Sequence, residues 1–391
     1  MSVSYWSNTK HGCNFNKEVD VVIVGGGLAG LSTKYWLNKL ESDMSVMVLE
    51  KGNSGAGASA RNAGFITCGS TEHFSRMESS YGEDKAEEIW KFTEYNHALM
   101  VEEFGKDFLE KECEYRNLGS WTLATTEHEI EVIVKTVKAL SDKGINVEWK
   151  DRAFEGAEGF YGGAYYKDDG EIHPLKYMQK ALLENSHHNK NHEFHYNQEV
   201  FEIEPKDSYI AIRSVNQNIK AQAVVLCTNA WSDQLFPWFK DKVSPMRGQI
   251  IVTEPVPQFL QPSYCSFVLD YFRQLVDGSV LIGGFRNADV EKEVGYSDEI
   301  NLIIDEKLED FLREHFPVLR GKRITHRWSG VMGFAADGYP MVGALNEDPR
   351  IFYNVGFTGT GLGYTFATGE LTARLILEGQ DPGIFSGRRF A

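Results

Sequence analysis

The sequence predicts an α/β fold, α+β when the whole chain is counted, with two interleaved units. Near the start, an apolar β-branched run (19–24) meets a glycine-rich turn and then helical spacing of apolar residues. Near the end, a second such run (351–355) meets another glycine-rich turn and a long helix (361–377). Between these ends lie charged, amphipathic helix patterns and further strand patterns. The unit that the ends form is therefore interrupted by a second unit.

Length, composition and charge limit the class of protein. The chain has 391 residues, 42% of them hydrophobic and 25% charged, which suits a globular protein with two cores. No apolar stretch approaches the ~18 residues of a membrane-spanning helix, and residues 1–17 are polar, unlike a signal peptide. The formal net charge of -16 repels nucleic-acid phosphates. We expect a cytoplasmic protein without a nucleic-acid partner or membrane insertion.

Neither the cysteines nor the histidines predict a metal site. The five cysteines include no C-x-x-C pair and are widely spaced, which is typical of reduced thiols. They are Cys13, Cys68, Cys113, Cys227 and Cys265. Four histidines lie close together at His187, His188, His192 and His195, in an Asn- and Lys-rich stretch. Such a stretch is more typical of a solvated loop than of a metal cluster.

The first unit begins as half of a doubly wound sheet. Residues 19–24 (VDVVIV) are nearly all apolar, as expected of a strand buried on both faces. Residues 25–30 (GGGLAG) form the turn, and helical spacing follows to residue 40. A second strand, 45–49 (SVMVL), ends on Glu50. Strand, turn, helix and strand in this order predict a Rossmann-type domain.

The turn carries a dinucleotide fingerprint in the required context, between a strand and a helix. Gly25 allows the tight turn, Gly27 lets a pyrophosphate approach the backbone, and Gly30 lets helix pack on strand. The helix N-terminus offers N–H groups and a positive dipole end to phosphates. Glu50, at the end of the second strand, can accept hydrogen bonds from ribose hydroxyls. By itself this pattern leaves FAD and NAD open.

The rest of the chain adds amphipathic helices and further strands. Helices are expected over 83–110, 127–143 and 305–316. Strands are expected over 120–124, 198–212 and 221–228, and several joined by turns over 243–286.

A small-residue loop after Glu50 decides between the two dinucleotides. Residues 55–65 read GAGASARNAGF. Here the sequence resembles the D-amino-acid-oxidase-like flavoenzymes, the superfamily of glycine oxidase, sarcosine oxidase and gamma-glutamylputrescine oxidoreductase. In that family such a loop crosses over the flavin, and its Ser and Arg meet the cofactor. Small residues let the backbone lie close to a planar ligand, and a guanidinium suits phosphate oxygens. The resemblance implies FAD.

Further segments extend the resemblance over nearly the whole chain. The family has a short leader, a DGxxxP stretch before a helix, a strand against the adenine and a strand-turn below the FAD. The matching segments here are 4–6 (SYW), 169–174 (DGEIHP), 199–200 (EV) and 224–231 (VVLCTNAW). Residues 337–343 and 353–361 resemble the family's closing segment, whose helix N-terminus faces the flavin. A positive helix end there stabilises the negative charge that reduced flavin gathers near N1.

The resemblance implies non-covalent FAD. Covalent relatives attach it through a cysteine, and the matching position here is Gly330. The residues that match the family's FAD contacts are Gly25, Gly27, Leu28, Ala29, Gly30, Glu50, Lys51, Ser59, Arg61, Asn62, Ala63, Gly64, Val200, Thr228, Gly356, Gly359, Thr360, Gly361 and Leu362.

The same resemblance implies a substrate domain built on an antiparallel sheet. It covers 93–167 and 237–327, whereas the FAD-binding domain covers 16–92, 168–236 and 328–386. The residues matched to the substrate pocket are Phe65, Arg286, Trp328, Met332 and Phe334. Tyr271 and Arg273 are matched to catalytic positions, although the flavin performs the chemistry.

Two departures from the family bear on the reaction. Relatives that oxidise free α-amino acids place an arginine five residues before Asp337, where this chain has Met332. Arg273 and Arg286 could replace its grip on a carboxylate. The lysine that promotes reaction with oxygen in sarcosine-type relatives corresponds to Leu281. The electron acceptor is therefore either O2 or another oxidant.

These features favour oxidation of the C–N bond of a small-molecule amine or N-substituted amino acid, with hydride transfer to flavin and hydrolysis of the imine. The motifs are closest to the gamma-glutamylputrescine oxidoreductase-like branch. Alternatives are an α-amino-acid oxidase or dehydrogenase with a relocated carboxylate-binding arginine, a flavin-dependent RNA-modifying enzyme, and a non-catalytic flavoprotein. The net charge disfavours the RNA enzyme. An NAD(P)-dependent dehydrogenase would have no role for the closing segment, Gly356–Gly361.

Overall fold

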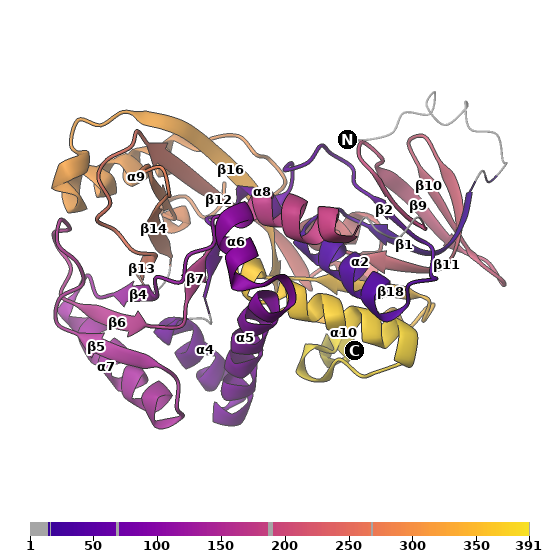
Figure 1. Cartoon of the computed structure of the whole chain (residues 1–391), viewed down its shortest axis with the longest axis horizontal. Helices are drawn as coiled ribbons and strands as arrows, with labels where there is room; N and C mark the ends of the chain where they lie inside the picture. The colour runs from indigo at the N-terminus through magenta and orange to yellow at the C-terminus, as the bar shows by residue number, and fades with distance from the viewer. Residues whose placement is uncertain (1–14, 16, 68–69, 187–190, 267–268, 391) are drawn as a thin grey trace. The chain divides into compact units, whose positions relative to one another are not determined.

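The computed structural model of the chain describes residues 15, 17–67, 70–186, 191–266 and 269–390 (Figure 1). The expected leader (4–6), Cys13, Cys68, His187 and His188 lie outside the described residues. The chain divides into two compact units made of alternating stretches of sequence. Unit 1 consists of Met1–Ala60, Leu175–Pro245 and Met332–Ala391, and unit 2 of Arg61–Pro174 and Met246–Val331. Residues 61–92, which the sequence assigns to the FAD-binding domain, are thus part of unit 2.

Unit 1 contains an eight-stranded sheet. Its strands are β1 (Lys17–Val24), β2 (Val46–Leu49), β8 (His192–His195), β9 (Val200–Pro205), β10 (Ile210–Ser214), β11 (Asn218–Leu226), β17 (Met341–Ala344) and β18 (Ile351–Val355). The central order is β17-β18-β11-β1-β2-β8, and β9 and β10 extend β11 as an antiparallel branch. From β18 to β8 all neighbours are parallel. This is the doubly wound sheet that the sequence predicts, which confirms the α/β class.

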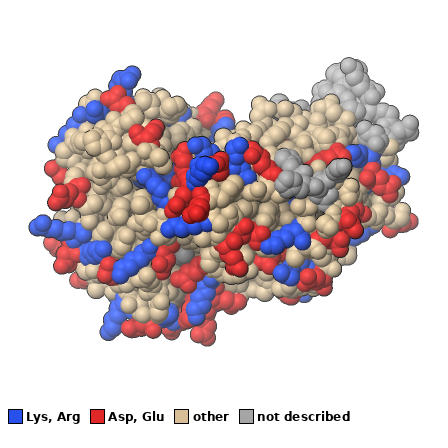
Figure 2. Space-filling view, in the orientation of Figure 1, with Lys and Arg blue, Asp and Glu red and all other residues tan. Residues whose placement is uncertain are grey.

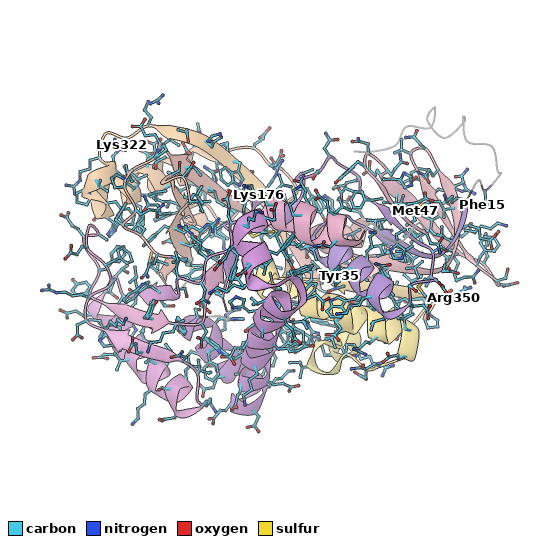
Figure 3. The ribbon with its side chains drawn as sticks, in the orientation of Figure 1. Phe15, Tyr35, Met47, Lys176, Lys322 and Arg350 are labelled. Atoms are coloured by element: carbon cyan, nitrogen blue, oxygen red, sulfur yellow. The ribbon has the colours of Figure 1, made fainter. Side chains whose placement is uncertain are left out.

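Two helices from opposite ends of the sequence pack together in unit 1. They are α2 (Leu28–Leu40) and α10 (Thr365–Glu378). The indole of Trp36 donates to the carbonyl of Phe366 over 3.1 Å, and their rings are 5.3 Å apart. Tyr35, labelled in Figure 3, also meets the Phe366 ring. A Cβ at Gly369 would lie 2.6 Å from the Cβ of Ser32, so glycine permits this close approach.

Unit 2 contains a second eight-stranded sheet, of order β16-β12-β15-β14-β13-β4-β6-β5. Its strands are β4 (Ser120–Leu123), β5 (Val147–Lys150), β6 (Gly163–Tyr166), β12 (Val243–Thr253), β13 (Ser263–Cys265), β14 (Asp270–Gln274), β15 (Val280–Gly283) and β16 (Ile324–Ala335). Along this order, adjacent strands are antiparallel in the run β12-β15-β14-β13 and in the run β4-β6-β5. The two runs meet where β13 pairs in parallel with β4. The expected antiparallel sheet therefore contains one parallel junction. A small ribbon pairs β3 (Phe65–Ile66) with β7 (Gly170–Glu171).

The helices of unit 2 differ from the predicted ones at their ends. They are α4 (Thr71–Tyr81), α5 (Glu83–Phe104), α6 (Lys106–Cys113), α7 (Glu127–Asp142) and α9 (Leu302–His315); the short α3 (Ala58–Arg61) and α8 (Pro174–Lys176) lie where the chain passes between units. The single helix expected over 83–110 is interrupted at Gly105, whose φ of 78° cannot continue a helix. Thr126 and Glu129 form a capping box that starts α7 at the predicted position.

Each sheet has its own core. In unit 1 the buried faces carry Val22, Met47, Ile219 and Tyr353, among others. Met47 is labelled in Figure 3. In unit 2, α9 covers one face of the sheet, where Phe272 meets Phe311 and Phe316. Among the described residues, no helix is both long and apolar enough to cross a membrane. On the face drawn in Figure 2, basic side chains are interspersed with acidic ones.

Candidate functional site

The glycine-rich turn of unit 1 lies at the carboxyl ends of its parallel strands, between β1 and α2. Gly25 has a φ of +108°, and a Cβ there would lie 2.5 Å from the carbonyl oxygen of Cys227. A Cβ at Gly30 would lie 1.9 Å from the carbonyl oxygen of Gly25. Neither position can hold a larger residue without moving backbone. The two glycines therefore bring the start of α2 directly against the ends of β1 and β11.

The Glu50 carboxylate is fixed beside this turn. One oxygen accepts a hydrogen bond from the Gly26 N–H at 2.8 Å, and the other accepts from the Gly52 N–H at 2.9 Å. Each carboxylate oxygen has a second lone pair, so both can still accept from a ligand hydroxyl. An acid held at the end of the second strand, next to the glycine turn, has the position that binds ribose in this fold.

Ser59 stands at the N-terminus of α2. Its Oγ accepts a hydrogen bond from the Leu28 N–H at 2.9 Å and would lie 2.6 Å from a Cβ at Gly27. Gly27 itself gives the helix no side-chain cap. The hydroxyl, the glycine and the N–H groups of a long helix together form a cradle that suits a phosphate group. These residues fit the pyrophosphate of FAD.

Lys51, Val200 and Thr228 follow or begin strands of the same sheet. The Lys51 ammonium lies 3.6 Å from the ring centre of Trp231, close enough for a cation–π interaction. Val200 is buried at the start of β9. The hydroxyl of Thr228, just after β11, is 2.8 Å from that of Ser232.

The closing segment forms a compact turn between β18 and α10. Gly356 has a φ of +82°, and its N–H donates to the side-chain oxygen of Asn229 at 3.0 Å. Gly359 has a φ of +83°, and the Thr360 hydroxyl donates to the carbonyl of Phe357 at 3.0 Å. Residues Gly361–Gly363, including buried Leu362, form a 3₁₀ turn, so α10 begins at Thr365 rather than at 361.

Met332 and Phe334 lie against this turn, within unit 1. The Met332 sulfur would be 3.6 Å from a Cβ at Gly359, and the Phe334 ring 3.7 Å from it. Backbone bonds hold the two stretches together, because Thr358 donates to the carbonyl of Gly333 at 2.9 Å. A thioether and an aromatic ring therefore line the closing turn at Gly359.

Arg61 is held by the returning strand β16 in unit 2. Its guanidinium donates to the carbonyl of Ser329 at 2.8 Å and to Asp298 at 3.1 Å. The indole of Trp328 donates to the carbonyl of Arg61 at 2.9 Å. A Cβ at Gly330 would lie 3.2 Å from that of Arg61, so this glycine makes room for the arginine stem.

The segment after Arg61 crosses the sheet face of unit 2 that α9 does not cover. Asn62 accepts from the Gly64 N–H at 2.8 Å, and the Ile172 N–H donates to the carbonyl of Gly64 at 2.8 Å. Ala63 and Phe65 then pack on Leu281 and its neighbours in a small apolar cluster. This cluster also includes Ile250 and Val252, with Tyr264, Tyr271 and Trp328 at its margin.

Tyr271 projects onto this same face. It pairs across the sheet with Tyr264 on one side and Gly283 on the other. Its ring lies over Gly283, where a Cβ would be 2.4 Å from the ring carbon. The Phe65 ring packs edge-on against both tyrosines, with centroids 4.9 Å from Tyr264 and 6.0 Å from Tyr271. Burial raises the pKa of Tyr271, so its hydroxyl keeps its proton.

Arg273 lies on the same face of the sheet as Tyr271, but it contacts a charged side chain. The guanidinium is 3.4 Å from the Glu171 carboxylate and donates to the carbonyl of Ile172 at 3.1 Å. Arg116 also binds Glu171, through its Nε at 2.5 Å, and the carboxylate is almost completely buried. Burial lowers the pKa of Arg273 and Glu171 raises it. The structure thus ties Arg273 into an ion-pair cluster that sequence reasoning missed.

Arg286 lies one turn beyond β15, in a 3₁₀ segment that follows Phe285. It is half-buried, and burial lowers its pKa while Tyr271 raises it. Tyr264, Glu171 and Asp298 were not identified from the sequence. Tyr264 is the direct cross-strand partner of Tyr271 in the pairing of β13 with β14.

Three of the cysteines and two of the four clustered histidines lie in the described part of the chain. Cys113, Cys227 and Cys265 are buried free thiols, as predicted, and burial raises the pKa of Cys227 to about 12. His195 is 2.9 Å from Glu193, and burial lowers the pKa of His192 to about 4. No group of three or more His, Cys, Asp or Glu residues within the described part of the chain is arranged to hold a metal ion.

Comparison with known proteins connects these features to a family. Residues 20–375 match the DAO family, described as FAD dependent oxidoreductase. The chain is 26% identical over 390 residues to a probable oxidoreductase, OrdL, of Haemophilus influenzae, covering 92% of this chain and 83% of the relative. It is 27% identical over 378 residues to gamma-glutamylputrescine oxidoreductase of Escherichia coli K12, covering 91% and 83%.

Among solved structures, glycine oxidase from Geobacillus kaustophilus superposes with a TM-score of 0.78 at 22% identity, covering 95% of this chain and 98% of that one. This likeness establishes the fold. The family match extends over nearly the whole chain and includes the glycine turn, Glu50 and the closing segment described above. The chain therefore belongs to the DAO family of FAD-dependent oxidoreductases.

Proposed function

We propose that this protein oxidises a C–N bond of an amine or N-substituted amino acid, and that water hydrolyses the resulting imine. The observation that carries the proposal is the apolar wall of Met332 and Phe334 against Gly359. Relatives that grip an α-carboxylate at position 332 need an arginine there. The names of three relatives each contain a compound of this class, because gamma-glutamylputrescine, glycine and sarcosine are all amines or amino acids.

FAD, when bound, supplies the acceptor for the hydride that leaves the carbon next to nitrogen. The chain's own residues have three tasks in this proposal. Gly27, Ser59 and Glu50 hold the pyrophosphate and ribose, which fixes the cofactor in one orientation. The start of α10 provides a positive helix end that favours negative charge on the reduced ring. Met332 and Phe334 exclude water from the reacting carbon.

We further propose that FAD is not covalently attached and that the site does not use a lysine to activate oxygen. Gly330 has no side chain, and the stem of Arg61 occupies the space beside it. Leu281, at the position of the oxygen-activating lysine, is buried among Ala63, Phe65 and Ile250. The electron acceptor in this proposal is O2 or another oxidant.

Anaerobic flavin reduction tests the proposed reaction. The FAD-loaded protein is mixed without oxygen with a panel of primary amines, N-alkyl amino acids and simple α-amino acids, and the visible flavin band is followed. We expect bleaching by members of the first two groups, and a carbonyl product on chemical analysis. If no compound of any group bleaches the band, the protein is better described as a non-catalytic flavoprotein. A heat-denatured sample of the same protein serves as the control.

A further inference from the structure

The chain that follows α10 packs against both parts of the closing segment, within unit 1. It forms two 3₁₀ turns, Gly383–Phe385 and Gly387–Phe390. Between these turns, Ser386 makes a parallel bridge to Val342 of β17. The 382–390 segment therefore lies beside the strand that pairs with β18, just before the closing turn.

The guanidinium of Arg389 binds the stretch between β16 and β17. It forms an ion pair with the Asp337 carboxylate through Nε and Nη2, the latter at 3.2 Å. Nη2 also donates to the carbonyls of Tyr339 and Pro340 at 2.9 and 3.0 Å, and Nη1 donates to the carbonyl of Phe385 at 3.0 Å. The guanidinium carbon lies 4.1 Å from the centre of the Tyr339 ring, which is within cation–π range. Arg389 thus connects its own segment to the stretch that precedes β17.

This ion pair is shielded from water, whereas its neighbour in sequence is not. The side chains of Arg389 and Asp337 are 15% and 14% exposed. Arg388 is 83% exposed and lies 3.5 Å from Asp381, which is 61% exposed. A shielded, charge-assisted pair contributes more than an exposed one. The two adjacent arginines therefore have the same charge but very different surroundings, which makes Arg388 a matched control.

Hydrogen bonds lead from the Asp337 stretch to the closing turn. The Gly338 N–H donates to the carbonyl of Ala335 at 3.0 Å, and the Ala335 N–H donates to the hydroxyl of Thr358 at 3.1 Å. Thr358 has a φ of +50°, which is rare for a β-branched residue. Because such a backbone persists only when the surrounding structure maintains it, the closing turn depends on the stretch that Arg389 holds.

Phe385 provides a second contact, to the start of α10. Its ring packs edge-on against those of Tyr364 and Tyr339, with centroids 6.1 and 6.2 Å away. All three side chains are almost completely buried, and such aromatic pairs stabilise beyond the area that they bury. Tyr364 is the residue directly before α10. The 382–390 segment therefore supports both the stretch before β17 and the beginning of the long helix.

Gly387 determines how closely this segment approaches the sheet. A Cβ at Gly387 would collide with the hydroxyl of Tyr353 on β18, and a Cβ at Gly343 on β17 would meet the same hydroxyl. The Tyr353 side chain is buried and cannot easily move aside. Replacing Gly387 by alanine would therefore displace the segment without changing any charge.

We propose that Arg389 and Phe385 are positioning residues for the flavin. They hold the closing turn and the start of α10 in the conformation that binds FAD and favours negative charge on the reduced ring. This inference rests on the FAD-binding role of the closing turn given under the proposed function. It makes the affinity for FAD and the reduction potential of the bound flavin depend on the 382–390 segment.

Flavin binding and reduction potential test the inference without an amine. FAD is titrated into the flavin-free protein, and the midpoint potential of the FAD-saturated protein is measured against a reference dye. We expect Arg389→Gln to weaken FAD binding about tenfold or more, as expected for loss of a charge-assisted hydrogen-bonding group, and to lower the midpoint potential. Arg389→Lys keeps the charge without the planar fork and should recover part of both. Arg388→Gln should match the parent.

Hydrogen exchange of the FAD-saturated protein locates the effect. We expect Arg389→Gln to accelerate exchange of backbone amides in peptides covering 333–345 and 353–364, and to leave the α7 peptide of unit 2 unchanged. Gly387→Ala should accelerate the same peptides and shift the flavin potential in the same direction, although every charge is retained. Melting temperatures are recorded for all variants, and Gly387→Ala and Arg389→Lys provide the comparison if Arg389→Gln does not fold.

Several outcomes would refute the positioning role. One is a folded Arg389→Gln with the FAD affinity and midpoint potential of the parent. Another is a lower melting temperature with unchanged potential and unchanged local exchange, which would make the contact only structural. Equal losses in Arg388→Gln would attribute the effect to net charge. Because none of these assays uses an amine, a parent protein that no amine reduces would refute the proposed reaction alone and leave this test intact.

Discussion

Replacing Glu171 by Gln should destabilise the protein far more than an ordinary charge removal. The Glu171 side chain is 1% exposed and is shared by two guanidiniums, those of Arg273 (7% exposed) and Arg116 (22% exposed). Glutamine keeps the shape but removes the negative charge. Two positive charges would then remain in or near the interior of unit 2 without their carboxylate.

The expected loss can be bounded from the remaining contacts. Removing one partner of a buried ion pair typically costs about 3–5 kcal/mol. Arg273 would keep its bond to the Ile172 carbonyl, and Arg116 would keep its bond to the carbonyl of Gln274. Because both arginines retain an acceptor and Arg116 is partly solvated, we expect the lower end, about 3 kcal/mol. For a domain of this size that corresponds to a melting temperature lower by about 6–12 °C.

Urea unfolding of the FAD-saturated protein measures this loss, with Glu158→Gln as control. Glu158 pairs with Arg320 at 3.1 Å, but both side chains are more than half exposed, so its removal should cost at most about 1 kcal/mol. Adding Arg273→Met to Glu171→Gln should recover part of the loss, because it removes one unpaired charge. If Glu171→Gln unfolds at the same urea concentration as the control, the pair does not hold Arg273. Arg273 would then again be a candidate for substrate binding.

Four further results are expected. Acid or heat should release the flavin into solution, because Gly330 offers no thiol; flavin that stays on the denatured chain would contradict non-covalent binding. Glu50→Gln should weaken FAD about tenfold, as loss of a charged hydrogen-bond acceptor costs ~1.5 kcal/mol, with the visible spectrum unchanged; dialysis against FAD measures this, and equal affinity would oppose the ribose assignment. Gly30→Ala should fail to load FAD, because its Cβ would meet the Gly25 carbonyl oxygen at 1.9 Å, and normal loading would refute that reasoning. Amines lacking an α-carboxylate should reduce the flavin faster than glycine or D-alanine; the opposite order, abolished by Arg273→Ala or Arg286→Ala, would identify an amino-acid enzyme.

The two ends of the nucleotide-type unit were predictable because their signals are local. The run 19–24, the turn glycines and the acid at 50 each follow from short-range rules about strands, turns and helix N-termini. The structure has β1, the turn and α2 in this order, and Gly25 and Gly30 have the tight contacts that their predicted roles require. The closing strand β18 likewise occurs at the predicted residues, 351–355.

Errors of prediction occurred where a local break competes with a longer pattern. The amphipathic pattern over 83–110 continues through Gly105, yet the backbone turns there because glycine accepts a positive φ. The strand pattern over 198–212 continues through a turn in which the Lys206 N–H donates to the carbonyl of Tyr209, and two strands result. The parallel pairing of β13 with β4 joins residues far apart in sequence, and no short-range pattern specifies it.

The distinction between the two arginines shows why a site cannot be assigned from strand periodicity alone. Tyr271 and Arg273 alternate onto one face of β14, so the sequence pattern makes Arg273 the natural partner of a substrate near Tyr271. Its environment is decided instead by Glu171, which reaches it from β7 through the pairing of β7 with Phe65. Arg286 lies beyond the strand, after a turn in which Asp270 accepts from the Phe285 N–H at 2.7 Å. A carboxylate contributed by another strand therefore determines the surroundings of the Arg273 guanidinium, and such a pairing exists only once the sheet has formed.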